Sequence, residues 1–589
     1  MYFKKKFVIA NRIWSMLTHR EQGNAIVLLG LMLIGMMLET LGVSLVIPAL
    51  ALLTQGDISP RYPAFQQVID ALGNPSQQTL VIGGMLVLVG VYLIKAMFLA
   101  LLAWWQMRFA FGVQAQLSQR LFAVYLNQPY TFHLQRNSAQ LIRNVINEVS
   151  MITGYALLPV TMLLTEGLVL IGLCGLMLAV EPQGALIVVS VLAAAAWFFH
   201  RLTHGRIERW GNARQYHEGL RMQHLQQGLG GAKDVKIFGK EAEFLQQYRI
   251  HNDQSARVAQ KQSTLQQLPR LWLELLAVSG LAILVISMLV QNRPLEAVLP
   301  TLGLFAAAAF RLMPSVSRIL GAVQALRYSM PMIDVLHAEL NLKIPEAAGN
   351  QKPSAPFHSV MELIHISYSY PAAASSALKD ISLLIKRGES VGFIGASGAG
   401  KSTLVDIILG LLTPEKGIVL VDDKDIQESL RNWQDQIGYV PQSIYLTDDT
   451  LRRNVAFGLP DEQIDDEAVK RAIHLAQLED FVSSLPNGLM TMVGERGIRL
   501  SGGQRQRIGI ARALYHDPAV LLLDEATSSL DTETEHGVMQ AVKALKGNKT
   551  ILIVAHRLST VDHCDRLYRL EKGELVNNVG RIGVLDNAT

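Results

Sequence analysis

The sequence predicts two domains of different kinds: an α-helical membrane domain with six spans and, after it, a soluble α/β nucleotide-binding domain. Three observations predict this fold. Half of the 589 residues are hydrophobic and only 17% are charged, which is a low charged fraction for a soluble chain. The apolar residues gather in long stretches before about residue 340. Beyond them lies a glycine-rich, phosphate-binding loop between an expected strand and an expected helix.

The composition excludes several functional classes. A formal net charge of +4 does not provide the dense basic face of a nucleic-acid-binding protein, so we expect no nucleic-acid partner. The two cysteines, Cys174 and Cys564, are too few for a disulfide framework and too far apart in the sequence for a zinc motif. We interpret both as packing residues.

Residues 1–23 precede the first long apolar stretch and begin MYFKKKFVIANRIW. They lack the long apolar core and small-residue cleavage site of a removed signal peptide. Lysines and arginines alternate with large apolar residues at helical spacing, which predicts a short helix lying on the membrane surface. An ordinary charged leader is the open alternative.

The membrane domain is expected over residues 24–340. Most of its apolar stretches reach the ~20 residues that a helix needs to cross a hydrocarbon core of ~30 Å. The six stretches are Asn24–Leu53, Leu80–Gln106, Ile152–Val180, Ala185–Leu202, Leu271–Val290 and Ala297–Leu320.

The connections between these stretches predict the topology. Those after the second and fourth spans, residues 108–150 and 204–270, are long and rich in arginine. The positive-inside rule therefore places them and both chain termini in the cytoplasm. Both keep helical apolar spacing, so we expect the membrane helices to extend into the cytoplasm and to meet at short transverse turns. Candidate turns lie at residues 132–142 and 230–239.

A polar linker is expected over residues 341–358, and the soluble domain over residues 359–589. The segment ESVGFIGASGAGKSTLVDIILGLL reads as a strand, a glycine loop and a helix and matches G-x-x-x-x-G-K-[ST]. Glycines let backbone N–H groups wrap phosphates at a helix N-terminus. Lys401 should reach the β- and γ-phosphates and the Ser402 hydroxyl should bind Mg²⁺. The expected nucleotide-binding residues of this loop are Gly395, Ser397, Gly398, Gly400, Lys401, Ser402 and Thr403.

Three further residues follow apolar strands of this domain. In AVLLLDEATSSLD, the strand ends at Asp524 and Glu525, at the carboxyl edge where α/β sheets bind ligands. Asp524 should hold Mg²⁺, and Glu525 should polarise an attacking water. His556 ends the strand ILIVA and suits the γ-phosphate. A salt-bridged acid pair and a structural histidine are the plainer alternatives.

The motif LSGGQ at Leu500–Gln504, together with these features, resembles ATP-binding-cassette (ABC) proteins. The resemblance implies an ABC-type domain that hydrolyses ATP with Mg²⁺. It also implies that Gln442 in YVPQS acts in catalysis and binds Mg²⁺, and that Tyr370 in SYSYP stacks on adenine, with Tyr368 as a competing choice. Asp531 matches a loop that crosses the dimer interface. The segment VGERG, Val493–Gly497, resembles a motif that exporters place beside the transverse turns.

The same resemblance implies a homodimer. In ABC proteins two nucleotide-binding domains pack head to tail, and the signature turn of one closes over the nucleotide held by the other. The residues implied are Ser501, Gly502, Gly503 and Gln504, opposite Lys401 of a second copy. Binding of ATP would join the two domains and hydrolysis would release them.

Ionisable residues inside spans are costly and are by default functional candidates. Lys95, Arg270, Arg311 and Arg318 are the tentative substrate residues. A cavity lined by Lys95, Arg311 and Arg318 from two chains would be strongly positive and would suit a phosphate or pyrophosphate head group. The alternative is that these cations pair with Glu39, Glu166 or Glu274 and only hold helices together.

Six spans before one ATPase resemble an exporter half-transporter. The segments ETLGVSLVIPAL, FRLMPSVSRI and STLVDIILGLL are similar to the bacterial flippases for lipid-linked oligosaccharides in protein N-glycosylation, and FQQVIDALG could form a small outer interfacial helix like theirs. The resemblance implies transfer of a polyprenyl-pyrophosphate glycan, an anionic membrane lipid, to the outer leaflet of a bacterial inner membrane. The alternatives are export of another amphipath, such as a lipid A precursor, a drug or a peptide, and an ATP-gated channel or sensor. A soluble ABC protein is excluded by the six spans.

Overall fold

The structure is a computed structural model that describes residues 11–54, 77–180, 182–290, 295–344, 357–371, 373, 375–494, 497–526, 532–555 and 557–580. Its internal contacts divide the chain into two compact units. The first, the membrane unit, is Met1–Gln128 with Gln135–Ile344, and the second, the nucleotide unit, is Pro129–Leu134 with Pro345–Thr589. Residues 1–10, the outer segment FQQVIDALG and most of the expected linker lie outside the described residues.

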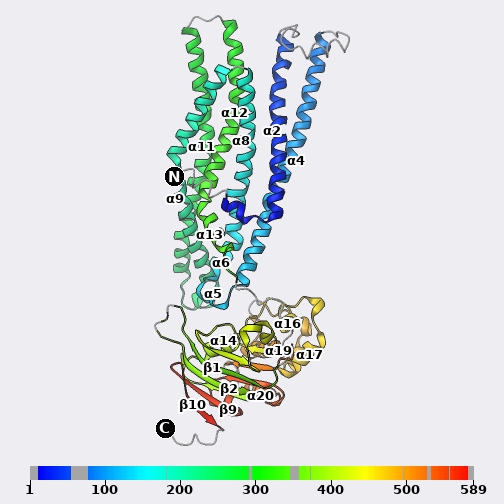
Figure 1. The fold of residues 1–589 in the computed structure, drawn as a ribbon, viewed down its shortest axis with the longest axis vertical. Coiled ribbons are helices and arrows are strands. Elements are labelled where there is room, and N and C mark those ends of the chain that lie inside the picture. The colour runs from blue at the N-terminus through cyan, green and yellow to red at the C-terminus, as the bar shows by residue number, and fades with distance from the viewer. Residues whose placement is uncertain are drawn as a thin grey trace. The chain divides into compact units, whose positions relative to one another are not determined.

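The membrane unit is helical, as predicted (Figure 1). Among the described residues, six long helices contain all or most of each expected span: α2 (His19–Thr54), α4 (Gln77–Leu126), α8 (Leu158–Val180), α9 (Pro182–Gly230), α11 (Glu241–Val290) and α12 (Leu295–Tyr328). Shorter helices of the described residues also belong to it, among them α6 (Ser138–Arg143), α7 (Val149–Ile152), α10 (Ala232–Ile237) and α13 (Met330–Leu340). The first expected transverse turn contains α6 and part of α5 (Tyr130–Gln135), and the second contains α10.

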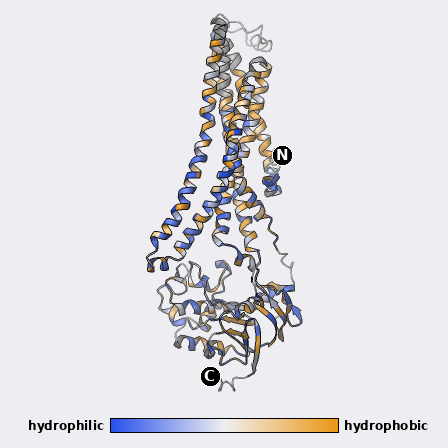
Figure 2. Ribbon diagram, turned by 90° about the vertical axis from the view of Figure 1, so that its left-hand side faces the viewer, coloured by the Kyte–Doolittle hydropathy of each residue, from blue (hydrophilic) through white to orange (hydrophobic). Residues whose placement is uncertain are grey.

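The helices are much longer than a bilayer requires. α4 has 50 residues, which at 1.5 Å per residue gives roughly 75 Å, more than twice a hydrocarbon core. Among the described residues, His19–Leu45, Gln78–Leu126 and Ser138–Ala179 are long and apolar enough to cross a membrane. The long helices α9 and α11 are mostly hydrophobic over one part of their length and mostly hydrophilic over the other (Figure 2). Helix length and composition thus agree with the prediction that membrane helices extend beyond the bilayer.

The third span is not a regular α-helix over its whole length. Two π-helical segments, Asn144–Glu148 and Thr153–Leu157, interrupt the run from α6 to α8. Glu148, at the end of the first segment, is fully buried. Its carboxylate lies 3.1 Å from Arg214 Nη2 on α9 and 3.6 Å from Arg143 Nε. This buried network joins the irregular run before α8 to the part of α9 that follows the fourth span.

The nucleotide unit contains two sheets. β1 (Val360–Tyr368), β2 (Leu378–Lys386), β4 (Lys416–Val421) and β5 (Lys424–Asp425) form an antiparallel sheet in the order β2-β1-β4-β5. The second sheet has the order β10-β9-β3-β8-β7-β6. Its strands are β3 (Ser390–Ile394), β6 (Ile437–Val440), β7 (Val520–Asp524), β8 (Thr550–Val554), β9 (Arg566–Glu571) and β10 (Glu574–Gly580). Only β10 runs antiparallel to its neighbour in this sheet.

The six-stranded sheet separates two apolar cores. Along β7, Leu521 and Leu523 belong to one cluster, while Val520 and Leu522 belong to the other. All four side chains are at most 2% exposed. Burial on both faces explains why the central strands read as continuous apolar runs. The helices of this unit are α14 (Lys401–Ile408), α15 (Leu430–Gln434), α16 (Leu451–Val455), α17 (Asp466–Leu475), α18 (Glu479–Ser484), α19 (Gly502–Leu514), α20 (Thr532–Ala544) and α21 (Leu558–Val561).

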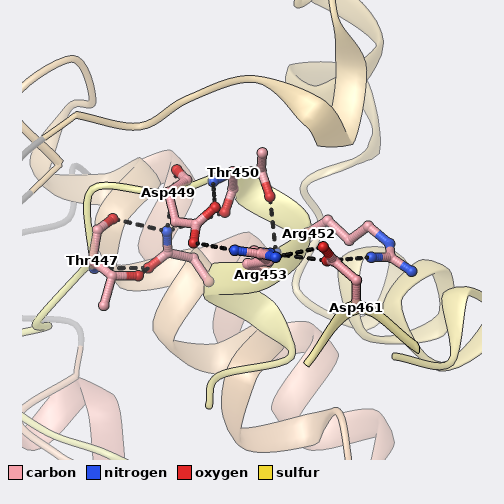
Figure 3. A network of polar contacts seen from close by, with 7 residues as sticks. Thr447, Asp449, Thr450, Arg452, Arg453 and Asp461 are labelled. Carbon is pink, nitrogen blue, oxygen red and sulfur yellow. Dashed lines mark hydrogen bonds and ion pairs between the residues drawn. The ribbon is translucent and has the colours of Figure 1, made fainter. Parts of the chain in front are cut away.

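A polar network fixes the segment that follows Gln442 in the chain (Figure 3). The fully buried Asn454 accepts from the Thr447 backbone N–H at 3.0 Å and donates to the carbonyls of Thr447 and Thr450 at 3.0 and 3.1 Å. Arg453 pairs with Asp449 and with Asp461. The Asn454 side chain thus provides hydrogen-bond partners for backbone groups of the turn at residues 447–450.

We predict that Asn454→Ala lowers the free energy of unfolding of the nucleotide unit by about 2–4 kcal/mol, because several buried backbone groups lose their partner. Calorimetry of the full-length protein in detergent measures the change. The matched control is Asn487→Ala, at an exposed position in the same unit, which should change stability by under ~0.5 kcal/mol. Equal effects of the two substitutions would contradict the role of Asn454.

Candidate functional site

The glycine loop between β3 and α14 has a backbone that only glycine fits. Gly395 has φ of +153°, and a Cβ there would lie 2.3 Å from the Leu570 carbonyl oxygen. Gly400, which caps α14, has φ of +105°, and a Cβ there would lie 2.7 Å from the Ala377 oxygen. The loop is therefore pressed against neighbouring backbone and turns directly into a helix N-terminus. This arrangement directs backbone N–H groups and the positive end of the helix dipole at a bound anion.

Lys401 is folded back over this loop. Its Nζ donates to the carbonyl oxygens of Gly395 at 2.8 Å and Ala396 at 3.0 Å. Burial lowers the pKa of Lys401, while the charges of Glu525 and Asp524 act in the opposite direction. The ammonium group thus lies in the loop, near the two carboxylates that end β7, as a phosphate-binding lysine requires.

The carboxyl end of β7 carries the two expected acids. Asp524 is 8% exposed. Glu525 has φ of +50°, a left-handed conformation that is strained for a residue with a side chain. Its carboxylate accepts a hydrogen bond from Gln442 Nε2 at 2.7 Å. Gln442 and Glu525, which are 83 positions apart in the chain, are thus in direct contact at the carboxyl end of β7, where the sequence predicts the catalytic groups.

The aromatic candidates for adenine stacking differ in burial. Tyr368 is 5% exposed and belongs to an apolar core. Tyr370 is partly buried at the edge of that core, and its hydroxyl lies 3.2 Å from Thr403 Oγ1 on α14. The two rings meet edge to face at 5.1 Å. Because Tyr368 is already enclosed, Tyr370 is the better candidate for stacking on a ligand.

The signature turn forms the N-terminus of α19, away from the glycine loop. Ser501 caps the helix in a reciprocal capping box, in which the Ser501 N–H donates to Gln504 Oε1 at 2.8 Å. Helix α19 packs against β6, while the glycine loop follows β3. These strands are three spacings apart in the sheet order, which is roughly 14 Å. The chain therefore presents two separate helix N-termini that can bind anions.

Two predicted site residues, His556 and Asp531, lie outside the described residues. The groups expected to hold Mg²⁺ are described. Ser402 lies in the first turn of α14, while the buried Asp524 acts electrostatically on Lys401 and Asp406 of the same helix. Hydroxyl, carboxylate and amide oxygens are ligands that Mg²⁺ prefers. The donor set of Ser402, Asp524 and Gln442 thus fits the ion.

Asp406 is a residue of the site that the sequence analysis missed. It lies on α14, between buried apolar residues, and burial together with the charge of Asp524 raises its pKa to about 6. Nothing in the local pattern marks it, because the strand that brings Asp524 close comes more than a hundred residues later.

The four candidate substrate cations have different environments in the membrane unit. Lys95 Nζ lies 2.7 Å from Glu39 Oε2, Arg318 Nε lies 2.7 Å from Glu166 Oε1, and Arg270 Nε lies 2.8 Å from Glu274 Oε1. The pairing that the sequence analysis kept as the alternative is thus present for these three. The side chain of Arg311 lies outside the described residues.

Comparisons with known proteins agree with the two-unit division. A family model described as "ABC transporter transmembrane region" matches residues 46–295, and one described as "ABC transporter" matches residues 378–528. A solved structure entitled "Structure of a bacterial Atm1-family ABC exporter with ATP bound" covers 95% of both chains with a TM-score of 0.78 at 23% identity. This likeness shows the fold.

Relatives of similar length carry a more specific name. A protein of Nitrosococcus oceani, named ATP-dependent lipid A-core flippase, is 31% identical over 79% of this chain and 77% of its own length. A protein of Thiobacillus denitrificans with the same name is 30% identical over 88% and 89% of the two chains. Neither name mentions lipid-linked oligosaccharides or protein glycosylation. The expected resemblance to glycosylation flippases is thus corrected to a likeness to lipid A-core flippases.

The raised pKa of Asp406 generates a pH prediction. A carboxyl group whose pKa is higher in the folded state stabilises the fold at low pH and loses this contribution as pH rises through about 6. We therefore expect Asp406→Asn to raise the stability of the nucleotide unit at pH 7.5 by about 1–2 kcal/mol and by a smaller amount at pH 4.5, which lies between the ordinary pKa of 3.8 and the raised value of about 6. Thermal unfolding at both pH values measures this. The exposed Asp448→Asn is the matched control, and an equal gain at both pH values would contradict the prediction.

Proposed function

From the premise that this chain belongs to the ABC transporter family, in which its ATPase domain hydrolyses ATP to drive transport across a membrane, we propose that it flips a phosphate-bearing amphipathic lipid between leaflets. The relatives' names support lipid A-core as the class of cargo. The single observation that supports an anionic cargo is the exposure of Arg318, whose side chain is 44% exposed within the membrane unit.

In the proposed ATPase site each residue has a role that follows from its position. The Gly395–Gly400 loop wraps the phosphates, Lys401 leaves its loop carbonyls for the β- and γ-phosphates, and Tyr370 stacks on adenine. Ser402, Asp524 and Gln442 would hold Mg²⁺, which neutralises phosphate charge when bound. Glu525 orients the attacking water and accepts its proton. His556 is proposed to contact the γ-phosphate.

The separation of the two helix N-termini supports a composite site. Ser501, Gly502, Gly503 and Gln504 at the start of α19 are proposed to close over the nucleotide held by Lys401 of a second copy, with Asp531 at the interface. The assembly would be a homodimer with two such sites. Because each site needs both copies, closure of the dimer is coupled to nucleotide binding.

The membrane orientation follows from charge. The long arginine-rich connections and both termini are proposed to lie in the cytoplasm, with the protein in the inner membrane of a bacterium. The cargo head group would then enter from the cytoplasmic side, while its acyl chains remain in lipid.

A polyprenyl-pyrophosphate glycan is the second candidate cargo. The segment FRLMPSVSRI carries two arginines, Arg311 and Arg318, and positive charge at this place suits a pyrophosphate as well as a phosphate head group. Both cargo classes present phosphate to a guanidinium, which binds phosphate through two parallel N–H···O contacts. They differ in the number and spacing of the phosphate groups.

We expect Glu525→Gln to lower ATP turnover by about 10²–10⁴-fold, because the variant keeps the contact to Gln442 but cannot accept a proton. ATP binding should persist. Phosphate release and retention of labelled nucleotide on the purified protein measure the two effects. The exposed Glu462→Gln is the control, and turnover at the wild-type rate in Glu525→Gln would exclude the proposed base.

We expect lipid A to stimulate ATP hydrolysis by the protein in phosphatidylcholine nanodiscs more than a polyprenyl-pyrophosphate glycan does, and a hydrophobic cation to have no effect. Arg318→Ala should weaken the response to both anionic lipids by about tenfold in half-maximal concentration, because a charged hydrogen bond is lost. Arg431→Ala, on the surface of the nucleotide unit, is the control. Equal stimulation by the cation, or an unchanged response in Arg318→Ala, would remove the basis for an anionic cargo.

A further inference from the structure

The membrane unit holds two ion pairs between neighbouring spans that differ in exposure. Glu39 on α2 pairs with Lys95 on α4, and both side chains are 10% exposed. Glu166 on α8 pairs with Arg318 on α12, and their side chains are 13% and 44% exposed. The oxygen–nitrogen distance is 2.7 Å in both pairs. The acid and the distance are thus matched, while the kind of cation and the access to it differ.

The Glu39–Lys95 pair is enclosed by its own helices. Lys95 Nζ lies 4.7 Å from the centre of the Tyr92 ring. A Cβ added at Gly42 would already lie 3.4 Å from Lys95 Cδ. A ligand cannot approach a cation packed in this way without separating α2 from α4. This pair has the properties of a structural contact, in which loss of one partner leaves a buried charge.

The Glu166–Arg318 pair is open on the side of the arginine. The contact to Glu166 uses Nε, and a guanidinium has further N–H donors in the same plane. A phosphate binds such a fork through two N–H groups. The exposed arginine can therefore exchange its present carboxylate for another anion while α8 and α12 stay packed.

We propose that Glu166 is the counter-ion of Arg318 in the ligand-free protein, and that the phosphate of the cargo displaces the Glu166 carboxylate from Arg318 when the cargo binds. The proposal rests on the proposed function and assigns a specificity role to a residue that does not itself bind the cargo. A lipid carboxylate would only replace one carboxylate by another and gains nothing from the exchange. A phosphate carries more charge and more acceptor oxygens, so it gains from the exchange. Glu166 thereby selects phosphate over carboxylate head groups.

The consequence is a substitution that tightens binding. In Glu166→Gln the competing charge is gone, so the half-maximal concentration of lipid A for ATPase stimulation should fall about fivefold, the factor expected for a partly exposed ion pair. Selectivity for phosphate over carboxylate lipids should fall as well. Thr165, the preceding residue, accepts a hydrogen bond from Gln106 of α4 at 2.8 Å. This contact remains and should keep α8 in place.

The matched control is Glu39→Gln, the same change in the enclosed pair. It should lower the thermal unfolding midpoint without lowering the half-maximal concentration. The double variant Glu166→Gln with Arg318→Gln should lose the gain in affinity, since the freed cation is then absent. Glu166→Asp keeps the charge and should retain the wild-type preference for phosphate over carboxylate lipids. This variant tests the proposal if Glu166→Gln does not fold.

The experiment uses the full-length protein in phosphatidylcholine nanodiscs, with lipid A, dephosphorylated lipid A, a polyprenyl-pyrophosphate glycan and a fatty acid as probes. A fivefold tighter response to lipid A in Glu166→Gln alone supports the proposal. An unchanged or weaker response in that variant, while wild type is stimulated by lipid A, overturns the counter-ion role and leaves the proposed function intact. Absence of stimulation of the wild type by lipid A and by the polyprenyl-pyrophosphate glycan overturns both.

Discussion

The structure depends on one electrostatic constraint: a cation that is even partly removed from water needs an acceptor, both before and after a ligand binds. Lys401 donates to two loop carbonyls, and Arg318 is held by Glu166. In both cases the chain supplies a modest internal acceptor for a side chain proposed to bind phosphate. Binding is then an exchange of partners, and its free energy is a difference between two charged contacts. This keeps the ligand-free protein folded and makes the response depend on the charge of the incoming group.

The elements that surround the expected nucleotide site could be predicted from the sequence because they are local. The glycine loop, its strand and its helix are contiguous, and the buried run Val520–Asp524 places its acids at a sheet edge by itself. What could not be predicted is what distant segments bring to that edge. The contact of Gln442 with Glu525 depends on the pairing of β6 with β7. Packing between segments that are distant in the sequence also makes Tyr368 more buried than Tyr370. The same packing brings Asp524 close enough to affect Asp406.

The membrane unit was predictable in its helices but not in its side-chain partners. Apolar length specifies a span, whereas the rotation and depth of one span against another come from packing. The sequence therefore left two interpretations of Lys95 and Arg318 open. The structure shows a pair at each and separates them by exposure. The cargo was the weakest part of the prediction for the same reason, because a few apolar segments shared with one subfamily do not specify a head group.

The π-helical segments Asn144–Glu148 and Thr153–Leu157 affect how the third span can be compared with those of related chains. Each wide turn contains more residues than an α-turn, so side chains after it point in directions that counting about 100° per residue does not give. Glu166 comes after both. An alignment that treats this span as a uniform α-helix would therefore misplace its acidic residue around the helix axis, and a gap of one residue at either wide turn changes the expected direction of that side chain by about 100°.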